Sequence, residues 1–219
     1  NLDVKNYLFD IESGIKVNEY IESAVTLDST SIKTKFEKIA PILQTIHASG
    51  KELRGEFAPF EEIKKYESLI QGEISYPNYE AVRKSVLSLK NELEKIGVDK
   101  KSCHIDLVPE NFIEGPNGHL YLIDWEYSSM NDPMWDLAAL FLESEFTPEE
   151  EADFLAYYEG DKTPVSREKI RIYKILQDII WGLWTIYKEE NGADFGDYGI
   201  TRYNRAVKEL QSQGGIDED

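Results

Sequence analysis

The chain has 219 residues, enough for one sizeable buried core, and carries 42 acidic against 24 basic side chains, a formal net charge of -18. This excess of negative charge argues against nucleic acid or an anionic membrane surface as a partner, because both are bound through clustered Lys and Arg. One cysteine, Cys103, excludes an internal disulfide, no apolar run reaches the roughly 20 residues of a membrane span, and the first residues do not resemble a signal peptide. We therefore expect a cytoplasmic protein.

The first predicted elements are two short strands, residues 7–10 and 15–21, joined by a turn at 12–14. Three helices are expected next, at residues 31–49, 60–71 and 79–96, where apolar side chains recur at helical spacing. The beginning of the chain is thus predicted to be a β-hairpin that leads into a helical region.

A segment rich in polar side chains follows these helices. His104, Asp106 and Asn111 precede a predicted hairpin, whose strands (residues 112–113 and 120–123) flank the turn Gly-Pro-Asn-Gly at 115–118, and Asp124 comes directly after it. Asn111 and Asp124 then lie near the same open end. Their oxygens suit magnesium, while Asp106 is placed to face a substrate hydroxyl. The plainer interpretation is a solvated turn in which Asp and Asn only mark the chain reversal.

The C-terminal half is predicted to be helical, with helices at residues 134–143, from 148 onward, from a cap at Ser166 to about 191, and at 203–211. Trp181 and Trp184 lie three residues apart on one helix face, and Phe195 and Tyr198 fall in a Gly-rich loop that can fold back over them. Aromatic faces bind trimethylammonium groups through cation–π contacts. A Trp pair on an apolar helix is, however, more often part of a core.

Three sequence motifs of this chain resemble those of bacterial choline kinases of the LicA type. The matching segments are His-x-Asp-x4-Asn at 104–111, Ile-Asp-Trp-Glu-Tyr at 123–127 and Asn-Asp-Pro-Met-Trp-Asp-Leu-Ala at 131–138. The resemblance implies an α+β, mostly helical fold: a protein-kinase-like C-terminal lobe (residues 25–219) after a short β remnant of the N-terminal lobe with the hinge (residues 1–24).

The resemblance also implies roles for particular residues. Asp106 would be the catalytic base and His104 would brace its loop, while Asn111 and Asp124 would bind Mg²⁺ and Asp136 would give structural support. Choline would be bound by an aromatic box with one carboxylate, and the adenine of ATP by the backbone of a hinge. The matching positions are Trp181, Trp184, Tyr198, Tyr127 and Glu143 for choline, and Glu19, Tyr20 and Ile21 for the hinge.

One departure from the family concerns the region before the hinge, where neither a Gly-rich phosphate loop nor a phosphate-binding Lys is recognisable. Because only about two strands precede the hinge, without this loop and Lys, and because the first residue is not Met, we expect an incomplete small lobe and weak or absent turnover. The main hypothesis is ATP-dependent phosphorylation of choline to phosphocholine. Two alternatives stay open: a kinase for ethanolamine or another amino alcohol, and a non-catalytic module that binds quaternary ammonium. The sequence does not fix the oligomeric state.

Overall fold

The computed structural model describes residues 2–212 and 214, which divide into two compact units. Unit 1 contains the chain up to Leu53 together with Lys101–Ser129 and Ala139–Val165. Unit 2 contains Arg54–Lys100, Met130–Ala138 and the chain from Ser166 onward. The predicted lobe boundary near residue 24 stays a prediction.

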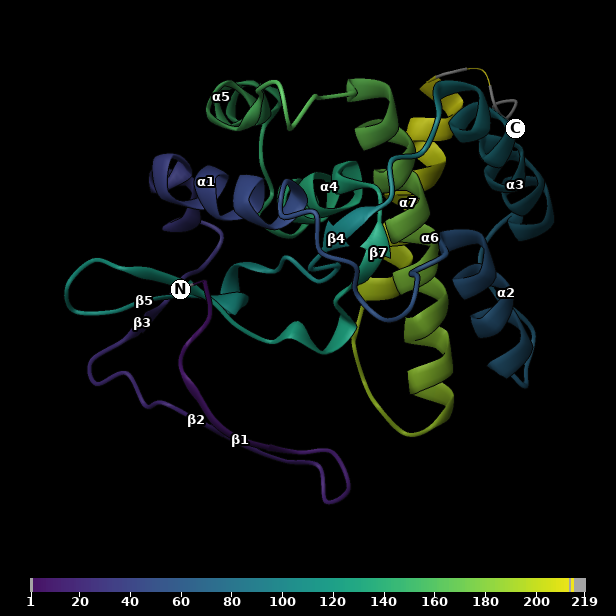
Figure 1. Ribbon diagram of the computed structural model, residues 1–219. Coiled ribbons are helices and arrows are strands. Elements are labelled where there is room, and N and C mark those ends of the chain that lie inside the picture. Colours follow the sequence, from purple (N-terminus) through teal and green to yellow (C-terminus); the bar gives the residue numbers. More distant parts are fainter. Residues whose placement is uncertain (1, 213, 215–219) are drawn as a thin grey trace. The chain divides into compact units, whose positions relative to one another are not determined.

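Unit 1 holds short antiparallel strands, seen in the purple and teal parts of Figure 1. β1 (Asn6–Asp10) pairs with β2 (Ile15–Asn18), and a second sheet has the order β3 (Val25–Thr26), β5 (Phe112–Glu114), β6 (Leu120–Leu122). β4 (Lys101–Cys103) leads into the polar segment. The β5–β6 hairpin confirms the prediction from the Gly-Pro-Asn-Gly turn.

The helices of unit 1 are α1 (Phe36–His47), which follows the 3-10 turn η1 (Ile32–Thr34), and α5 (Pro148–Tyr158). They pack against each other around buried apolar side chains such as Leu43 and Phe154. α5 begins with a capping box, in which Thr147 and Glu150 satisfy each other's backbone amides. Burial of this apolar surface is what holds the helices beside the short strands.

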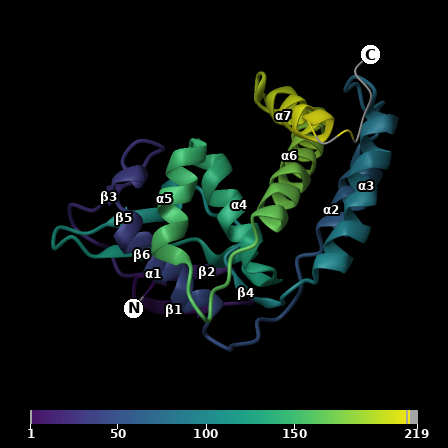
Figure 2. The same ribbon diagram turned by 90° about the horizontal axis from the view of Figure 1, so that it is seen from above.

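Unit 2 is helical. α2 (Pro59–Leu69), α3 (Tyr79–Ile96) and α7 (Tyr198–Ser212) all pack on the long α6 (Arg167–Glu190), and α6 and α7 lie side by side in both Figure 1 and Figure 2. α3 buries Val82, Val86 and Leu89, which share one helix face. α4 (Pro133–Glu143) and β7 (Ser129–Asn131) contribute residues to both units.

The mostly helical fold predicted from the sequence is confirmed. The cap at Ser166 is also confirmed, because its side chain accepts a hydrogen bond from the amide of Lys169. Some boundaries were wrong. The strand predicted at 15–21 ends at Asn18, the predicted helix at 31–49 is divided by Lys35, which leaves the helical region at ψ 25°, and the last helix begins at Tyr198 and not at 203. Within the described residues, no helix has both the length and the apolar character that crossing a membrane requires.

Candidate active site

The loop from His104 to Asn111 leaves β4 in unit 1 and is fixed by its histidine. His104 is fully buried, its Nε2 donates a hydrogen bond to the carbonyl of Ile123 at 2.9 Å, and the ring of Trp125 meets it edge-on at 4.9 Å. Since a carbonyl only accepts, Nε2 carries the proton. The histidine therefore ties the start of this loop to the residue that precedes Asp124.

Two residues of the site have left-handed backbone conformations. Ile105, between His104 and Asp106, has φ 79°, and Asp124 has φ 65°. Asp tolerates this region, but a β-branched residue such as Ile105 is strained there, typically by about 1–3 kcal/mol. The surrounding packing holds Ile105 in place, because the residue is buried. The strain is stored next to the proposed catalytic carboxylate.

Asp106 is half-buried, and its pKa is raised mainly because burial disfavours the charged carboxylate. The carboxylates of Glu143 and Asp124 raise this pKa further, while His104 and a hydrogen bond from Asn111 lower it. Glu143, the last residue of α4, is thus near enough to Asp106 to raise its pKa, and its substrate-binding role stays a prediction.

Asn111 and Asp124 are positioned by the β5–β6 hairpin. Phe112 pairs with Leu122, and the amide of Ile123 donates to the carbonyl of Asn111 at 2.9 Å. The side-chain nitrogen of Asn111 donates to the main-chain oxygen of Asp106 at 2.9 Å, which leaves its oxygen as the atom suited to a cation. The donor set is therefore all oxygen and fits Mg²⁺.

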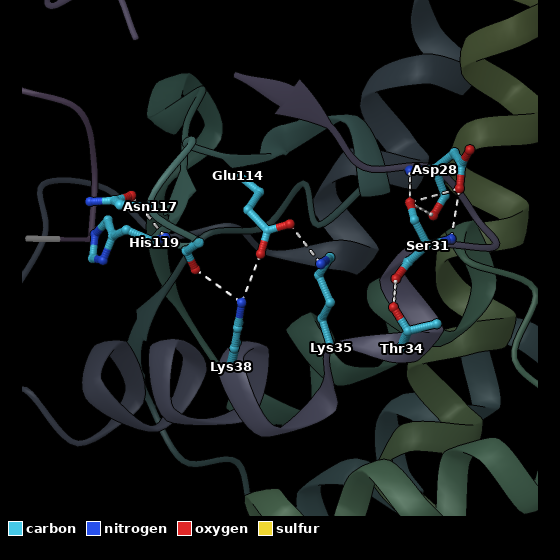
Figure 3. A network of polar contacts seen from close by, with 9 residues as sticks. Asp28, Ser31, Thr34, Lys35, Lys38, Glu114, Asn117 and His119 are labelled. Carbon is cyan, nitrogen blue, oxygen red and sulfur yellow. Dashed lines mark hydrogen bonds and ion pairs between the residues drawn. The ribbon is translucent and has the colours of Figure 1, made fainter. Parts of the chain in front are cut away.

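The hairpin is held on α1 by an ion-pair clamp that sequence analysis missed. Glu114 receives hydrogen bonds from Lys35 and Lys38, each at 2.7 Å (Figure 3). Lys38 also donates to the turn carbonyl of Gly118. Both lysines lower the pKa of Glu114. The partners lie more than 75 residues apart in sequence, so no local pattern reveals them.

The predicted hinge lies between β2 and β3. The amide of Glu19 donates to the carbonyl of Lys5 at 2.7 Å, Tyr20 is 86% exposed, and the carbonyl of Ile21 accepts from the amide of Ala24 at 3.3 Å. Adenine recognition by this segment stays a prediction. Tyr127, at the end of the 3-10 turn η3 (Trp125–Tyr127), is exposed, and its substrate-binding role also stays a prediction.

Three of the predicted substrate-binding residues lie together in unit 2. The rings of Trp181 and Trp184 on α6 meet at right angles at 6.1 Å, Phe195 packs on Trp184 at 4.9 Å, and Tyr198 follows at 6.4 Å from Phe195. Phe195, in the segment after α6, therefore packs back onto Trp184, whereas Tyr198 begins helix α7 and does not lie in the predicted loop. Phe195, which the predicted box omits, is the ring between Trp184 and Tyr198. We call these four rings the aromatic cluster.

Asp136, in the first turn of α4, is fully buried, and its supporting role stays a prediction. A neighbouring motif residue, Asp132, has contacts that sequence analysis did not foresee. It accepts from the amide of Met134 at the start of α4, and its other oxygen binds the ammonium of Lys169 at 2.8 Å and the amide of Asp99. Asp132 thus anchors the start of α4 to α6 within unit 2.

The fold and the residues around the β5–β6 hairpin define a protein of the kinase-like class. The sequence profile of the choline/ethanolamine kinases matches residues 7–169. The chain belongs to the choline/ethanolamine kinase family.

Individual relatives agree with this membership. Two Haemophilus influenzae proteins named LicA are 31% identical over 96% of the chain. The chain spans 65% of the first of them, just under two thirds of its length, and 82% of the second. The crystal structure of choline kinase LicA from Streptococcus pneumoniae is 79% identical, with a TM-score of 0.93 over 96% of this chain and 75% of that one. A structure of LicA in complex with AMP has a TM-score of 0.92 at 79% identity, over 96% of this chain and 74% of that one.

Proposed function

We propose that this protein is a choline kinase that transfers the terminal phosphoryl group of ATP to the hydroxyl of choline. The observation that supports this most is the arrangement of Asp106, Asn111 and Asp124 around one hairpin, in a chain 79% identical to a protein described as a choline kinase. A base and two oxygen ligands in this order are what phosphoryl transfer requires of a protein.

Asp106 is the proposed base. Its raised pKa makes the carboxylate a better proton acceptor than an exposed aspartate, so it can take the proton of the choline hydroxyl as the oxygen attacks the phosphorus. The bond from that phosphorus to the bridging oxygen of ADP then breaks. The hydrogen bond from Asn111 to the main chain of Asp106 keeps the base and the metal ligand in fixed relation.

Asn111 and Asp124 would hold Mg²⁺, which neutralises charge on the phosphates when it is bound. The hinge residues Glu19, Tyr20 and Ile21 would bind the adenine edge of ATP. The relative bound to AMP supports a nucleotide site in this family.

The aromatic cluster would bind the trimethylammonium group, which has no hydrogen to donate and is held by ring faces at roughly 0.5–2 kcal/mol each. The substrate-binding roles of Tyr127 and Glu143 rest on the resemblance in sequence. We place the protein in the cytoplasm, where ATP is available, and expect neither nucleic acid nor membrane as a partner.

The test measures ADP release with choline, Mg²⁺ and ATP, first in the unsubstituted protein, because the weak or absent turnover expected from an incomplete small lobe stays a prediction. Asp106→Asn is expected to lower kcat by about 10²–10⁴-fold, the usual contribution of a general base. Glu110→Gln, an exposed acid on the same loop, is the matched control and should keep full activity. Turnover of Asp106→Asn within tenfold of the parent protein would contradict the assignment of the base.

Calorimetry distinguishes choline kinase from its alternatives. A choline kinase binds choline more tightly than ethanolamine and loses this preference in Trp184→Ala. Equal or tighter ethanolamine binding would favour the amino alcohol alternative. Choline binding without any affinity for Mg²⁺-ATP would identify a binding module instead.

A further inference from the structure

The proposed choline site includes Tyr198, and this ring is held by a buried cation. The guanidinium of Arg202 donates from Nη1 to the hydroxyl of Tyr198 at 2.8 Å, and its central carbon lies 5.1 Å from the ring centroid. Arg202 is only 4% exposed. The two residues are four apart on α7, so the helix brings their side chains onto one face.

Arg202 is fixed in turn by α6. Its Nε lies 3.2 Å from a carboxylate oxygen of Asp178, a residue that is 1% exposed. Asp178 also receives two hydrogen bonds of 2.6 Å from Arg205, in the bidentate geometry of a strong pair. A buried carboxylate between two guanidinium groups has little freedom to move.

This series of contacts begins at Asp178 and returns to Trp184, and both residues lie on α6. Asp178 lies on α6 one turn before Trp181, and Trp184 follows. The contacts from Asp178 through Arg202 therefore fix Tyr198 relative to the Trp pair, with Phe195 between them.

The position of Arg202 determines what Tyr198 can do. One part of its ring already meets a guanidinium, and its hydroxyl oxygen already accepts a hydrogen bond from a cation. Tyr198 nevertheless stays 39% exposed, so ring surface remains for a ligand. Tyr198 would then contribute an immobile ring surface, which determines the shape of the site.

We propose that Arg202, anchored by Asp178, is a positioning residue that holds Tyr198 in the aromatic cluster so that the cluster fits a quaternary ammonium group. This rests on the proposed function. Arg202 acts through Tyr198 and has no role in the transfer step itself. Its loss should weaken choline binding and leave the chemistry of Asp106 intact.

The test compares Arg202→Met with Arg205→Met. Both remove one guanidinium from Asp178, but only the first releases Tyr198. We expect Arg202→Met to raise the KM for choline about tenfold, equivalent to 1.4 kcal/mol, with kcat within twofold and a smaller change for ethanolamine. Arg205→Met should leave the KM for choline within twofold.

Tyr198→Phe serves as a second variant, since it keeps the ring and removes the hydroxyl that Arg202 binds. It should raise the KM for choline in the same direction, and melting curves of all variants identify any that fail to fold. An unchanged KM in Arg202→Met and Tyr198→Phe, or an equal rise in Arg205→Met, would overturn the inference alone. Absence of choline binding in the unsubstituted protein would overturn the proposed function as well.

Discussion

Nε2 of His104 donates a hydrogen bond of 2.9 Å to the main-chain carbonyl of Ile123. This bond joins the motif at 104–111 to the motif at 123–127 in unit 1. One motif carries Asp106 and the other Asp124, so this single contact relates the proposed base to a proposed metal ligand. The edge-on contact between His104 and Trp125 adds a second connection.

Replacement of this histidine by an aromatic ring without a donor should therefore cost stability. His104→Phe keeps the packing on Trp125 but leaves the carbonyl of Ile123 without its hydrogen bond, a loss of about 1–3 kcal/mol in the free energy of unfolding. Urea denaturation measures it. The control is His119→Phe, a substitution of an exposed histidine. Equal free energies of unfolding of the two variants would show that the hydrogen bond of His104 does not stabilise the fold.

The raised pKa of Asp106 makes a prediction about pH. Because burial raises the folded-state pKa above the value in the unfolded chain, the ionised carboxylate costs stability, and that cost is present above the folded-state pKa and disappears below the unfolded one. Asp106→Asn should thus be more stable than the parent protein at pH 7, with a difference that shrinks as the pH falls toward about 4. Melting temperatures of both proteins between about pH 3 and 8 check this, because that range includes the titration of both ordinary carboxyls and carboxyls with a raised pKa. A stability difference that does not vary with pH would contradict the stated cause.

The same shift affects activity. As the pH is lowered, a base with a raised pKa becomes protonated, and therefore inactive, at a higher pH than an ordinary aspartate does. The fall of kcat on the acid side of its pH profile should therefore be centred above about pH 4. The profile of Glu110→Gln should coincide with that of the parent protein.

The clamp of Glu114 between Lys35 and Lys38 should support the metal ligands indirectly. The lowered pKa of Glu114 means that the clamp stabilises the fold above the unfolded carboxyl pKa and is lost as the pH falls through the folded one. Glu114→Gln is expected to cost about 1 kcal/mol or less at pH 7, and to raise the Mg²⁺ concentration needed for half-maximal activity. Glu61→Gln, which breaks an exposed pair with Lys64, should leave the Mg²⁺ dependence unchanged.

The contact between α6 and α7 depends on a glycine. A Cβ on Gly199 would lie 2.5 Å from the hydroxyl of Tyr76 and 2.9 Å from the side chain of Thr185. Gly199→Ala should therefore lower the free energy of unfolding by about 1–3 kcal/mol through overpacking. Gly160→Ala, whose Cβ would make an ordinary contact at 3.5 Å, is the matched control. Equal melting temperatures of these two variants would refute the tight packing of α7 on α6.

Local sequence signals predicted the parts of this fold that short-range chemistry determines. The Gly-Pro-Asn-Gly turn gave the β5–β6 hairpin, and Ser166 gave the start of α6. The start of α7 was missed because Gly196 and Gly199 indicate a loop, whereas α7 packs so closely on α6 that a Cβ has no room at Gly199 and the low helix propensity of glycine does not decide the structure there.

The candidate site divides in the same way. Motif spacing predicted that Asn111 and Asp124 flank a hairpin, and helical spacing predicted that Trp181 and Trp184 meet. The lysines on Glu114 and the anchoring of Arg202 by Asp178 were not predictable, because an ion pair between distant segments leaves no periodic pattern in the sequence.

Cys103, fully buried at the end of β4 and directly before His104, gives this protein a built-in reporter. A thiol reagent reaches Cys103 only when β4 opens. The rate of thiol labelling at increasing urea concentrations therefore gives the free energy of opening of β4. The rate in the presence of nucleotide or choline would then show which ligand protects the strand, without any introduced label.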